Sequence, residues 1–422
     1  MEQKRSLSIF SIPVLVAALG YFVDIYDLLL FSIVRKKSLA GLGLDPEAVA
    51  STGLDIIGFQ MWGLMIGGII WGMLGDKKGR LSVLFGSILL YSIANIFNGF
   101  VHTPEQYRWC RFIAGIGLAG ELGAGITLVS ELLPKEKRGI ATSMVAGIGL
   151  TGAVVAYFIA ASFDWRICYF IGGGLGLSLL LLRVSVFESG MFKDIRHQEV
   201  SKGNFFMFFT RWPRFKKYIL SILIGLPTWY VIGILVSFAD KFGKEFHVQG
   251  DVDPGKGVMF AYIAISIGDI LVGLLSQALK SRKKALYIFY AITVVAMVLY
   301  FRQDGGSVSQ MYFLCALLGF GTGFWAIFVT MAAEHFGTNL RATAATTVPN
   351  MVRGSLPLLI MLFKKLQPAQ SYVQAAITTG IVVMVISVLA AVFTEETFGK
   401  DLNFLETGGE LSLGDDEEEA VA

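Results

Sequence analysis

The sequence predicts an all-α membrane protein whose twelve transmembrane helices form two pseudo-symmetric six-helix bundles. Composition is the first reason, because 55% of the 422 residues are hydrophobic and only 16% are charged. A soluble protein of this composition could not cover its surface with polar groups, so lipid must surround most of the chain. The second reason is that apolar runs of membrane-spanning length recur along the chain, and the third is that charged motifs of one half recur in the other.

The apolar runs fall into two sets of six, separated by a polar stretch. Each run is close to the ~20 residues that a helix needs to cross a bilayer. The first six lie near residues 10–34, 54–74, 81–101, 107–133, 139–162 and 165–187. The second six lie near residues 217–238, 258–279, 285–302, 308–333, 344–364 and 370–394. We therefore expect an N-terminal half at 1–187, a central cytoplasmic loop at 188–216, a C-terminal half at 217–394 and a disordered acidic tail at 395–422.

Charged residues beside the predicted helix ends repeat between these halves. Glu131 and Arg138 have counterparts, at the same spacing, in Glu334 and Arg341. A repeat of this kind indicates two homologous halves that pack face to face. The substrate site of such a protein is expected between the halves, near the middle of the membrane.

The distribution of Lys and Arg predicts the orientation of the chain in the membrane. With the N-terminus inside, most of the Lys and Arg residues outside the spans lie in cytoplasmic segments, as the positive-inside rule requires. The run Arg35-Lys36-Lys37 is a local exception on the outer side. We expect both termini to be cytoplasmic and the protein to reside in a plasma membrane or a bacterial inner membrane.

The turn between the second and third predicted helices combines glycine with charged residues. Glycine permits a tight turn and close helix approach, whereas Asp and Arg can pair with charges on neighbouring helix ends. Such a cluster can hold the cytoplasmic ends of the helices together in one state and release them in the other. We predict a cytoplasmic gate formed by Gly72, Asp76, Gly79, Arg80, Glu131 and Arg138, with Glu334 and Arg341 as the second-half equivalents.

Four carboxylates lie inside predicted spans and away from the span ends, where an ionised carboxylate is costly and usually functional. Asp24 and Asp27 are three residues apart and share one face of the first helix. Glu121 lies near the middle of the fourth helix, and Asp269 lies in the eighth. We predict that these four residues serve proton coupling, with Asp27 and Glu121 as the first choices.

Arg353 lies in the middle of the eleventh helix, between Pro349 and Pro357, which predict a bent or broken helix. A guanidinium group offers fixed donors to a carboxylate or a phosphate. The alternative is a structural ion pair between Arg353 and an intramembrane acid. We predict a substrate site formed by Arg353, Arg111, Asn350, Trp229, Tyr230 and Trp325.

Several of these motifs resemble the major facilitator superfamily over nearly the whole chain. Residues 72–80, GMLGDKKGR, are similar to the signature loop of that family. Residues 24–31, DIYDLLLF, and the Gly120-Glu121 pair resemble the metabolite:proton symporters, the phosphate:proton symporters and their sugar-porter relatives. The resemblance implies the twelve-helix fold and proton-driven uptake of a small anion or zwitterion.

The function predicted from the sequence is proton-coupled symport of a small organic anion of the carboxylate type, by alternating access. The alternatives are a phosphate or zwitterion symporter, proton-coupled drug or metabolite efflux, and a membrane sensor that does not transport. An enzyme is not expected, because we find no pairing of a nucleophile with a base and no metal-ligand spacing. The expected partners are a small anionic molecule, protons and the lipid bilayer. We expect a monomer with no cofactor, no metal and no nucleic-acid partner.

Overall fold

The computed structural model describes residues 11–78, 80–121, 135–188, 205–400 and 406. Within these residues the regular structure is helical, apart from an isolated bridge between Gln249 and Ser307. The all-α prediction is confirmed for this part of the chain. The N-terminal helices are α1 (Ile12–Gly41), α2 (Pro46–Lys78), α3 (Arg80–Asn98), α4 (Pro104–Leu118), α6 (Lys135–Ser162) and α7 (Trp165–Glu188).

The C-terminal helices are shorter and more often interrupted. They are η2 (Phe205–Phe209), α8 (Trp212–Tyr230), the π-helical turn η3 (Val231–Val236), α9 (Ala239–Glu245), α10 (Pro254–Ala278), α11 (Arg282–Phe301), α12 (Val308–Gly321), α13 (Trp325–Glu334), α14 (Thr338–Gly354), α15 (Leu356–Leu366) and α16 (Tyr372–Phe393).

Many of these helices suit a membrane by length and composition. Among the described residues, eight segments are long and apolar enough to cross a bilayer, and two shorter apolar helices accompany them. Their outward faces carry large exposed apolar side chains such as Phe97, Leu181 and Phe393. These side chains would be unfavourable in water, whereas lipid solvates them. The chain is therefore a multi-pass membrane protein.

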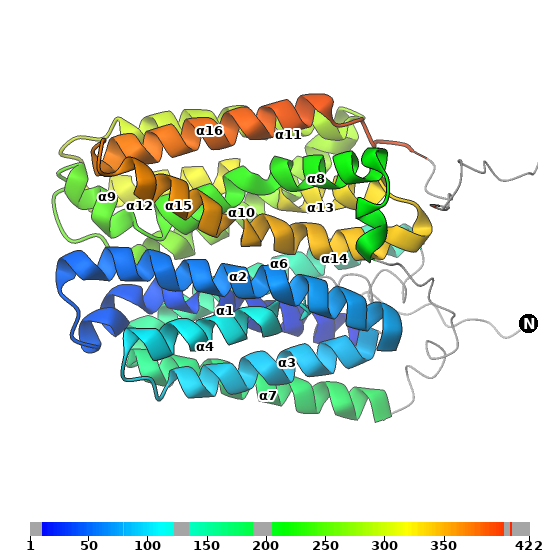
Figure 1. Cartoon of the computed structure of the whole chain (residues 1–422), viewed down its shortest axis with the longest axis horizontal. Helices are drawn as coiled ribbons and strands as arrows, with labels where there is room; N and C mark the ends of the chain where they lie inside the picture. The colour runs from blue at the N-terminus through cyan, green and yellow to red at the C-terminus, as the bar shows by residue number, and fades with distance from the viewer. Residues whose placement is uncertain (1–10, 79, 122–134, 189–204, 401–405, 407–422) are drawn as a thin grey trace, which may run out of the picture.

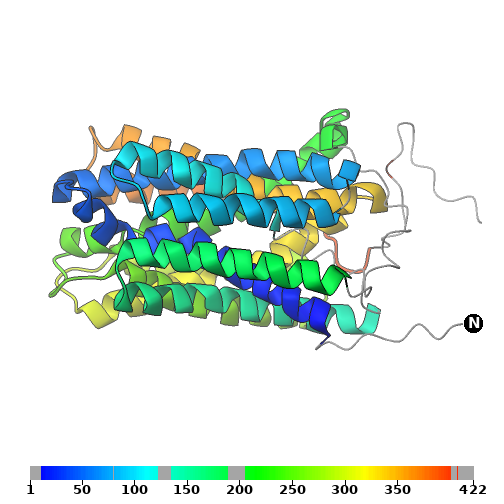
Figure 2. The same ribbon diagram turned by 90° about the horizontal axis from the view of Figure 1, so that it is seen from below.

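The helices run roughly along one axis and gather in two groups (Figures 1 and 2). The N-terminal helices pack on one another, with α1 against α6, α2 against α4 and α3 against α7. The C-terminal helices do the same, with α10 against α12 and α8 against α16. The two groups meet where α1, α2 and α6 face α10, α14 and α15. We call the end that carries the α1–α2 turn, opposite the start of α1, the distal end (Figure 1).

Glycine allows α2 and α4 to approach at backbone distance. A Cβ atom on Gly115 would lie only 2.2 Å from the backbone oxygen of Gln60. Conversely, a Cβ atom on Gly67 would lie 2.4 Å from the backbone oxygen of Ile116. Small residues at such a crossing maximise van der Waals contact between helices in a bilayer. Gly115 of α4 and Gly67 of α2 therefore serve helix packing.

Three C-terminal spans depart from a regular α-helix along their length. Pro227 lies inside α8, four residues before the π-helical turn η3 begins. A proline in a helix interior removes a backbone hydrogen bond, which accounts for the irregular helix that follows it. A non-helical link separates α12 from α13. In the eleventh predicted span, α14 ends at Gly354 and α15 begins at Leu356, which agrees with the break that the two prolines predict.

Replacing Gly115 with Ala should destabilise the protein, because the new methyl group meets backbone atoms that cannot move aside. We expect a loss of about 1–3 kcal/mol, measured as a lower midpoint of thermal unfolding in detergent. Gly174→Ala in α7 is the matched control, since a Cβ atom there meets nothing within 4 Å. The control should unfold at or slightly above the wild-type temperature, because alanine favours helix. Equal midpoints for the two variants would contradict the close α2–α4 packing.

Candidate functional site

The first buried ion pair of the N-terminal helices joins α1 to α4. Nη1 of Arg111 lies 3.1 Å from Oδ1 of Asp27, and both side chains are fully buried. The same guanidinium group donates to the backbone oxygen of Asp27 at 3.1 Å and to Oδ1 of Asn95 at 2.8 Å. Its Nε donates to Oε1 of Gln60 at 3.3 Å. Arg111, predicted to support substrate binding, thus has its donors engaged inside the N-terminal helices.

A second buried ion pair joins the end of α4 to α7. Glu121 is 1% exposed and accepts two hydrogen bonds from Arg183, of which the Nη1–Oε2 bond measures 2.9 Å. The pair lies against Gly20 of α1, where a Cβ atom would collide with both side chains. The two carboxylates that the sequence favours for proton coupling, Asp27 and Glu121, therefore each have an arginine partner.

Asp24 differs from both of these carboxylates. Its side chain is 1% exposed, and neither carboxylate oxygen has a hydrogen-bond partner among the described residues. Arg353 of α14 is the cation that attracts Asp24 most strongly, and it belongs to the other group of helices. The charge of Arg353 also acts on Tyr21 of α1 and on Tyr262 of α10. Asp24 thus faces the boundary between the two groups of helices.

Arg353 is a buried cation in the middle of the C-terminal helices. It is 2% exposed, and its guanidinium carbon lies 5.8 Å from the ring centroid of Trp229 and 5.6 Å from that of Trp325. Its one hydrogen bond to a side chain is weak, at 3.4 Å to Oδ1 of Asn350. No carboxylate lies within ion-pair distance of Arg353 in the part of the chain that the structure describes.

Each of the three residues of this guanidinium–indole cluster (Arg353, Trp229 and Trp325) lies beside a helix break. Trp229 precedes the π-helical turn, Trp325 is the first residue of α13, and Arg353 is next to the last residue of α14. A π-helical turn inside an α-helix is frequently found at a functional site. The breaks allow side chains from three different spans to converge.

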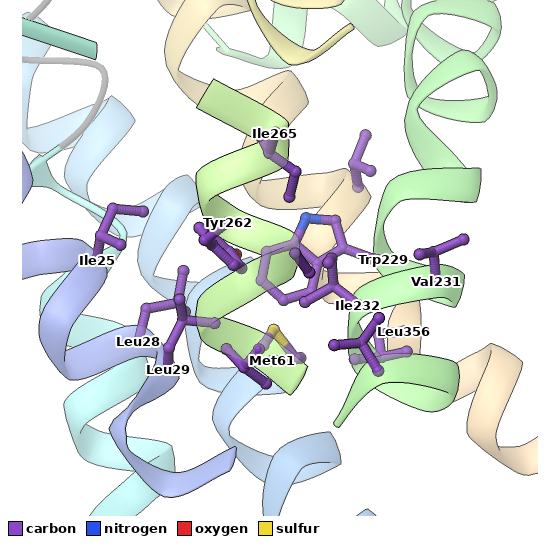
Figure 3. Close-up of a cluster of buried hydrophobic side chains, with 14 of the residues drawn as sticks. Ile25, Leu28, Leu29, Met61, Trp229, Val231, Ile232, Tyr262, Ile265 and Leu356 are labelled. Atoms are coloured by element: carbon purple, nitrogen blue, oxygen red, sulfur yellow. The ribbon is translucent and has the colours of Figure 1, made fainter. Parts of the chain in front are cut away.

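Besides Arg353, several apolar side chains lie near Trp229 (Figure 3). Figure 3 shows its indole ring projecting from α8 toward Tyr262 of α10, with Leu29 of α1 and Met61 of α2 on the near side. The indole N–H of Trp229 has no acceptor among the described residues. A planar apolar ligand would therefore find ring faces here, together with an available donor.

The remaining residues of the predicted substrate site have structural partners. Asn350 donates from Nδ2 to the backbone oxygen of Ala119 at 2.9 Å, which ties α14 to the end of α4. The hydroxyl of Tyr230 donates to the backbone oxygen of Ala376 at 2.5 Å, so this ring points into the C-terminal helices. Asp269 accepts from the backbone N–H of Ala326 at 2.9 Å. It thereby fixes the start of α13, where Trp325 lies.

Three residues of the predicted cytoplasmic gate, Gly72, Glu334 and Arg341, are described in the structure. Glu334 accepts from Nη2 of Arg282 at 3.2 Å and from the hydroxyl of Thr397 at 2.7 Å. Arg341 is half-buried at the start of α14. A Cβ atom on Gly72 would lie 3.4 Å from Cγ2 of Thr347 of α14. The predicted gate residues whose placement or side chain lies outside the described residues are Asp76, Gly79, Arg80, Glu131 and Arg138.

Glu396 extends the network around Glu334 to the segment that follows α16. Burial opposes ionisation of this carboxylate, but hydrogen bonds from the Ser281 hydroxyl and from the backbone N–H groups of Phe398 and Arg282 outweigh it. Together they lower the pKa of Glu396 to about 2. The carboxylate is therefore ionised at neutral pH, and it holds the start of α11 against the end of α16.

The distal end carries three ion pairs between the two groups of helices. Arg35 of α1 is fully buried, lies 2.5 Å from Oδ1 of Asp240 of α9, and stacks on the ring of Phe238 at 4.2 Å. The exposed pair Lys36–Asp251 measures 2.8 Å. The half-exposed pair Lys364–Asp55 measures 2.6 Å. Two residues of the basic run that departs from the positive-inside pattern, Arg35 and Lys36, are therefore paired with acids of the C-terminal half, whereas Lys37 donates to the backbone oxygen of Ala160.

The family model of the Major Facilitator Superfamily matches residues 7–359. The chain belongs to this superfamily. Membership of this superfamily identifies the protein as a membrane transporter rather than an enzyme. A major facilitator symporter of proton and xylose has a similar structure, with a TM-score of 0.67 over 93% of this chain and 97% of the other, at 18% sequence identity. This likeness supports the fold.

Curated relatives of this transporter cover most of its length. A niacin transporter of Acinetobacter baylyi is 26% identical over 92% of this chain and 94% of its own. A putative niacin/nicotinamide transporter of Bacillus subtilis is 26% identical over 79% of this chain and 82% of its own. A gentisate transporter of Corynebacterium glutamicum is 24% identical over 77% of this chain and 75% of its own.

Sequence reasoning did not assign a role to several residues that the structure of this transporter brings into the site. Arg183 lies inside an apolar run, and a charged residue in such a run indicates a buried partner or a functional role. Gln60, Tyr21 and Tyr262 gave no comparable signal, because neutral polar residues are common in spans. Arg35 was recognised only as an exception to the charge rule.

Replacing Arg183 with Met should be strongly destabilising, because it leaves the Glu121 carboxylate buried without a cation. We expect a loss of about 3–5 kcal/mol in thermal unfolding, and partial recovery in the double variant Arg183→Met/Glu121→Met. The control is Lys241→Met, which removes one member of a half-exposed pair with Glu245. That change should cost less than ~1 kcal/mol. Equal losses for the two single variants would contradict a buried ion pair.

Proposed function

We propose that the protein takes up an aromatic carboxylate together with protons, by alternating access between two halves of the molecule. The observation that carries this proposal is Arg353, a buried guanidinium group between two tryptophan rings without a carboxylate partner among the described residues. A buried unpaired cation is costly in a membrane, so such a group usually binds something. An anionic ligand supplies the missing charge.

The chemistry of the guanidinium–indole cluster favours an aromatic acid over other anions. A guanidinium group binds a carboxylate with two parallel hydrogen bonds. The faces of Trp229 and Trp325 offer stacking surface for a ring attached to that carboxylate. Niacin and gentisate, which name the substrates of the relatives, are both aromatic carboxylates. Phosphate has no ring to stack, and this makes it a weaker candidate.

A zwitterion is the second candidate. The unpartnered carboxylate of Asp24 could bind an ammonium group while Arg353 binds a carboxylate. The stacking surface of Trp229 and Trp325 beside Arg353 favours the aromatic acid, because a zwitterion without a ring would leave both ring faces unused.

The twelve-helix topology of the sequence prediction remains part of this proposal. The eight membrane-length segments, the two shorter apolar helices, α4 with the residues after it, and α14 with α15 together supply twelve candidate spans. We further propose halves at 1–187 and 217–394, joined by the segment 188–216. We also propose a tail at 395–422, cytoplasmic termini and a monomer in a bacterial-type inner membrane.

Uptake into proteoliposomes tests the proposed substrate. The wild type should take up labelled niacin faster with an inward proton gradient, and excess benzoate should compete whereas phosphate and amino acids should not. Arg353→Ala should lower uptake at least about 30-fold, since removing one partner of a buried charge contact costs 2–5 kcal/mol. Trp229→Phe should keep most of the uptake, and Trp229→Ala should lose most of it.

Arg166→Ala is the control for that experiment, because Arg166 stacks on Trp165 near the distal end and is not close to Arg353. It should transport at close to the wild-type rate. Niacin uptake that is indifferent to Arg353→Ala would remove the arginine from the site. Competition by amino acids instead of benzoate would favour the zwitterion.

Alternating access further requires contacts that close each end in turn. We propose that the Arg35–Asp240 pair, with its flanking pairs Lys36–Asp251 and Lys364–Asp55, closes the distal end in the conformation described here. Each pair joins one group of helices to the other, so substrate entry from that side must break them. The predicted gate at Gly72, Asp76, Gly79, Arg80, Glu131, Arg138, Glu334 and Arg341 would act at the opposite end.

A charge exchange tests the distal contact. Arg35→Asp and Asp240→Arg should each lower uptake about tenfold, because each places two like charges at the boundary of the helix groups. The double variant Arg35→Asp/Asp240→Arg should regain a large part of the lost uptake. Lys36→Ala, which removes an exposed pair, should change uptake less than about twofold. A double variant no better than the worse single variant would argue against a gating contact.

A further inference from the structure

We propose that Asp269 sets the preference of this transporter for aromatic over aliphatic carboxylates, as a positioning residue that holds Trp325 against Arg353. This inference rests on the proposed function, because it needs a substrate ring beside Trp325. The sequence alone placed Asp269 among four candidate proton carriers. Its contacts in the fold favour a different role.

The first turn of α13 has no cap of its own. A helix leaves its first four backbone N–H groups without partners inside the helix. In a bilayer an N–H group without an acceptor is costly, and α13 begins inside the apolar segment Val308–Glu334. The residue before the helix is Phe324, whose side chain cannot accept a hydrogen bond. The acceptor for these N–H groups therefore has to come from another part of the fold.

Asp269 of α10 supplies this acceptor. Its Oδ1 accepts from the backbone N–H of Ala326 at 2.9 Å, and the carboxylate also accepts from the backbone N–H of Trp325. These two residues begin α13, where the positive end of the helix dipole attracts a carboxylate. Asp269 thus acts as an N-cap that one helix provides for another.

Two glycines bring the backbone of α10 against the link between α12 and α13. A Cβ atom on Gly323 would lie 2.7 Å from Cα of Gly268, the residue before Asp269. A Cβ atom on Gly268 would lie 2.8 Å from the backbone oxygen of Phe320. The gap that the Asp269 side chain bridges is therefore set by backbone contact, so the length of that side chain determines where α13 begins.

The cap acts on the proposed substrate site through Trp325. Because Trp325 is the first residue of α13, its backbone position depends on the cap. Its ring centroid lies 5.6 Å from the guanidinium carbon of Arg353, and the residue is partly exposed. Trp229, the other tryptophan of the guanidinium–indole cluster, comes from α8 and makes no use of this cap.

The consequence of this arrangement is selectivity. A guanidinium group binds a carboxylate whatever group is attached to it. The face of Trp325 adds a stacking contact that only an aromatic ring can use, and such contacts depend on ring geometry. A shift at the start of α13 would therefore weaken the stacking contact and leave the contact between Arg353 and the carboxylate in place. Asp269 thus affects which carboxylate binds best.

Competition against labelled niacin measures this preference. Benzoate and cyclohexanecarboxylate are the probes, because both are ring monocarboxylates and only benzoate is aromatic. Benzoate should be the better competitor for the wild type. Asp269→Ala should reduce its advantage about threefold to tenfold, as the loss of one aromatic contact requires. The KM for niacin should rise by a similar factor while kcat changes less than about twofold. KM does not depend on the amount of folded protein, so a less stable variant still gives a valid reading.

A double-mutant cycle shows whether Asp269 acts through Trp325. In a Trp325→Ala background, Asp269→Ala should have no further effect on the benzoate preference, because the ring through which it acts is gone. In a Trp229→Phe background, which is the matched control, Asp269→Ala should keep its full effect. A further loss of equal size in both backgrounds would mean that Asp269 only stabilises the fold, and the inference would be wrong.

Two conservative variants separate positioning from proton transfer, and they carry the test if Asp269→Ala does not fold. Asp269→Asn keeps the side-chain length and an acceptor oxygen but is not an acid. Asp269→Glu keeps the acid but is longer by one methylene. We expect the Asn variant to retain the benzoate preference and niacin accumulation with a proton gradient, and the Glu variant to lose benzoate preference. The opposite result, with accumulation kept by Glu and lost by Asn, would identify Asp269 as a proton carrier and overturn the inference.

The outcomes also separate this inference from the proposed function. If the wild type takes up niacin and Asp269→Ala leaves the benzoate preference unchanged, this inference is wrong while the substrate assignment stands. If the wild type neither binds nor takes up any aromatic acid, both are overturned, because no substrate ring then lies against Trp325.

Discussion

The cost of an unpaired charge in apolar surroundings is the constraint on which this structure depends. In water a lone carboxylate is cheap, whereas in a bilayer it requires a counter-charge, hydrogen bonds or a proton. The N-terminal helices meet this requirement twice, through Asp27 with Arg111 and through Glu121 with Arg183. These pairs also link α1 to α4 and α4 to α7, so charge neutralisation and helix assembly have the same origin.

The N-terminal and C-terminal groups of helices contribute different features to the proposed site. The described N-terminal helices are long, and glycines bring α2 and α4 into backbone contact. The C-terminal helices are broken in three spans, and the breaks aim Trp229, Trp325 and Arg353 at one another. One group thus provides a neutral scaffold with a single unpaired carboxylate, and the other provides an anion site with an unpaired guanidinium group. The opposite charges of these two residues lie across the boundary that must open and close during transport.

Arg35 shows that a basic residue with an ion-pair partner is poor evidence for the orientation of a chain in the membrane. As a sequence feature, the run of three basic residues contradicts the expected orientation of the chain. In the structure, Arg35 is fully buried between Asp240 and the ring of Phe238, and Lys36 reaches Asp251. A basic residue that is neutralised by another helix carries little information about topology, because its charge is not free to interact with the membrane surface.

The sequence by itself determined that the chain is a helical membrane protein of the major facilitator type, because span length, composition and the 72–80 motif are local properties of the chain. It also determined which charges would lie inside spans, among them Asp24, Asp27, Glu121, Arg111 and Arg353. The tertiary structure decided which of these charges meet. A charge pair such as Glu121 with Arg183 joins residues far apart in the chain, and no local pattern specifies that contact. For the same reason only the fold could show that Asp24 and Arg353 have no ion-pair partner among the described residues, and that Trp229 and Trp325 flank the arginine.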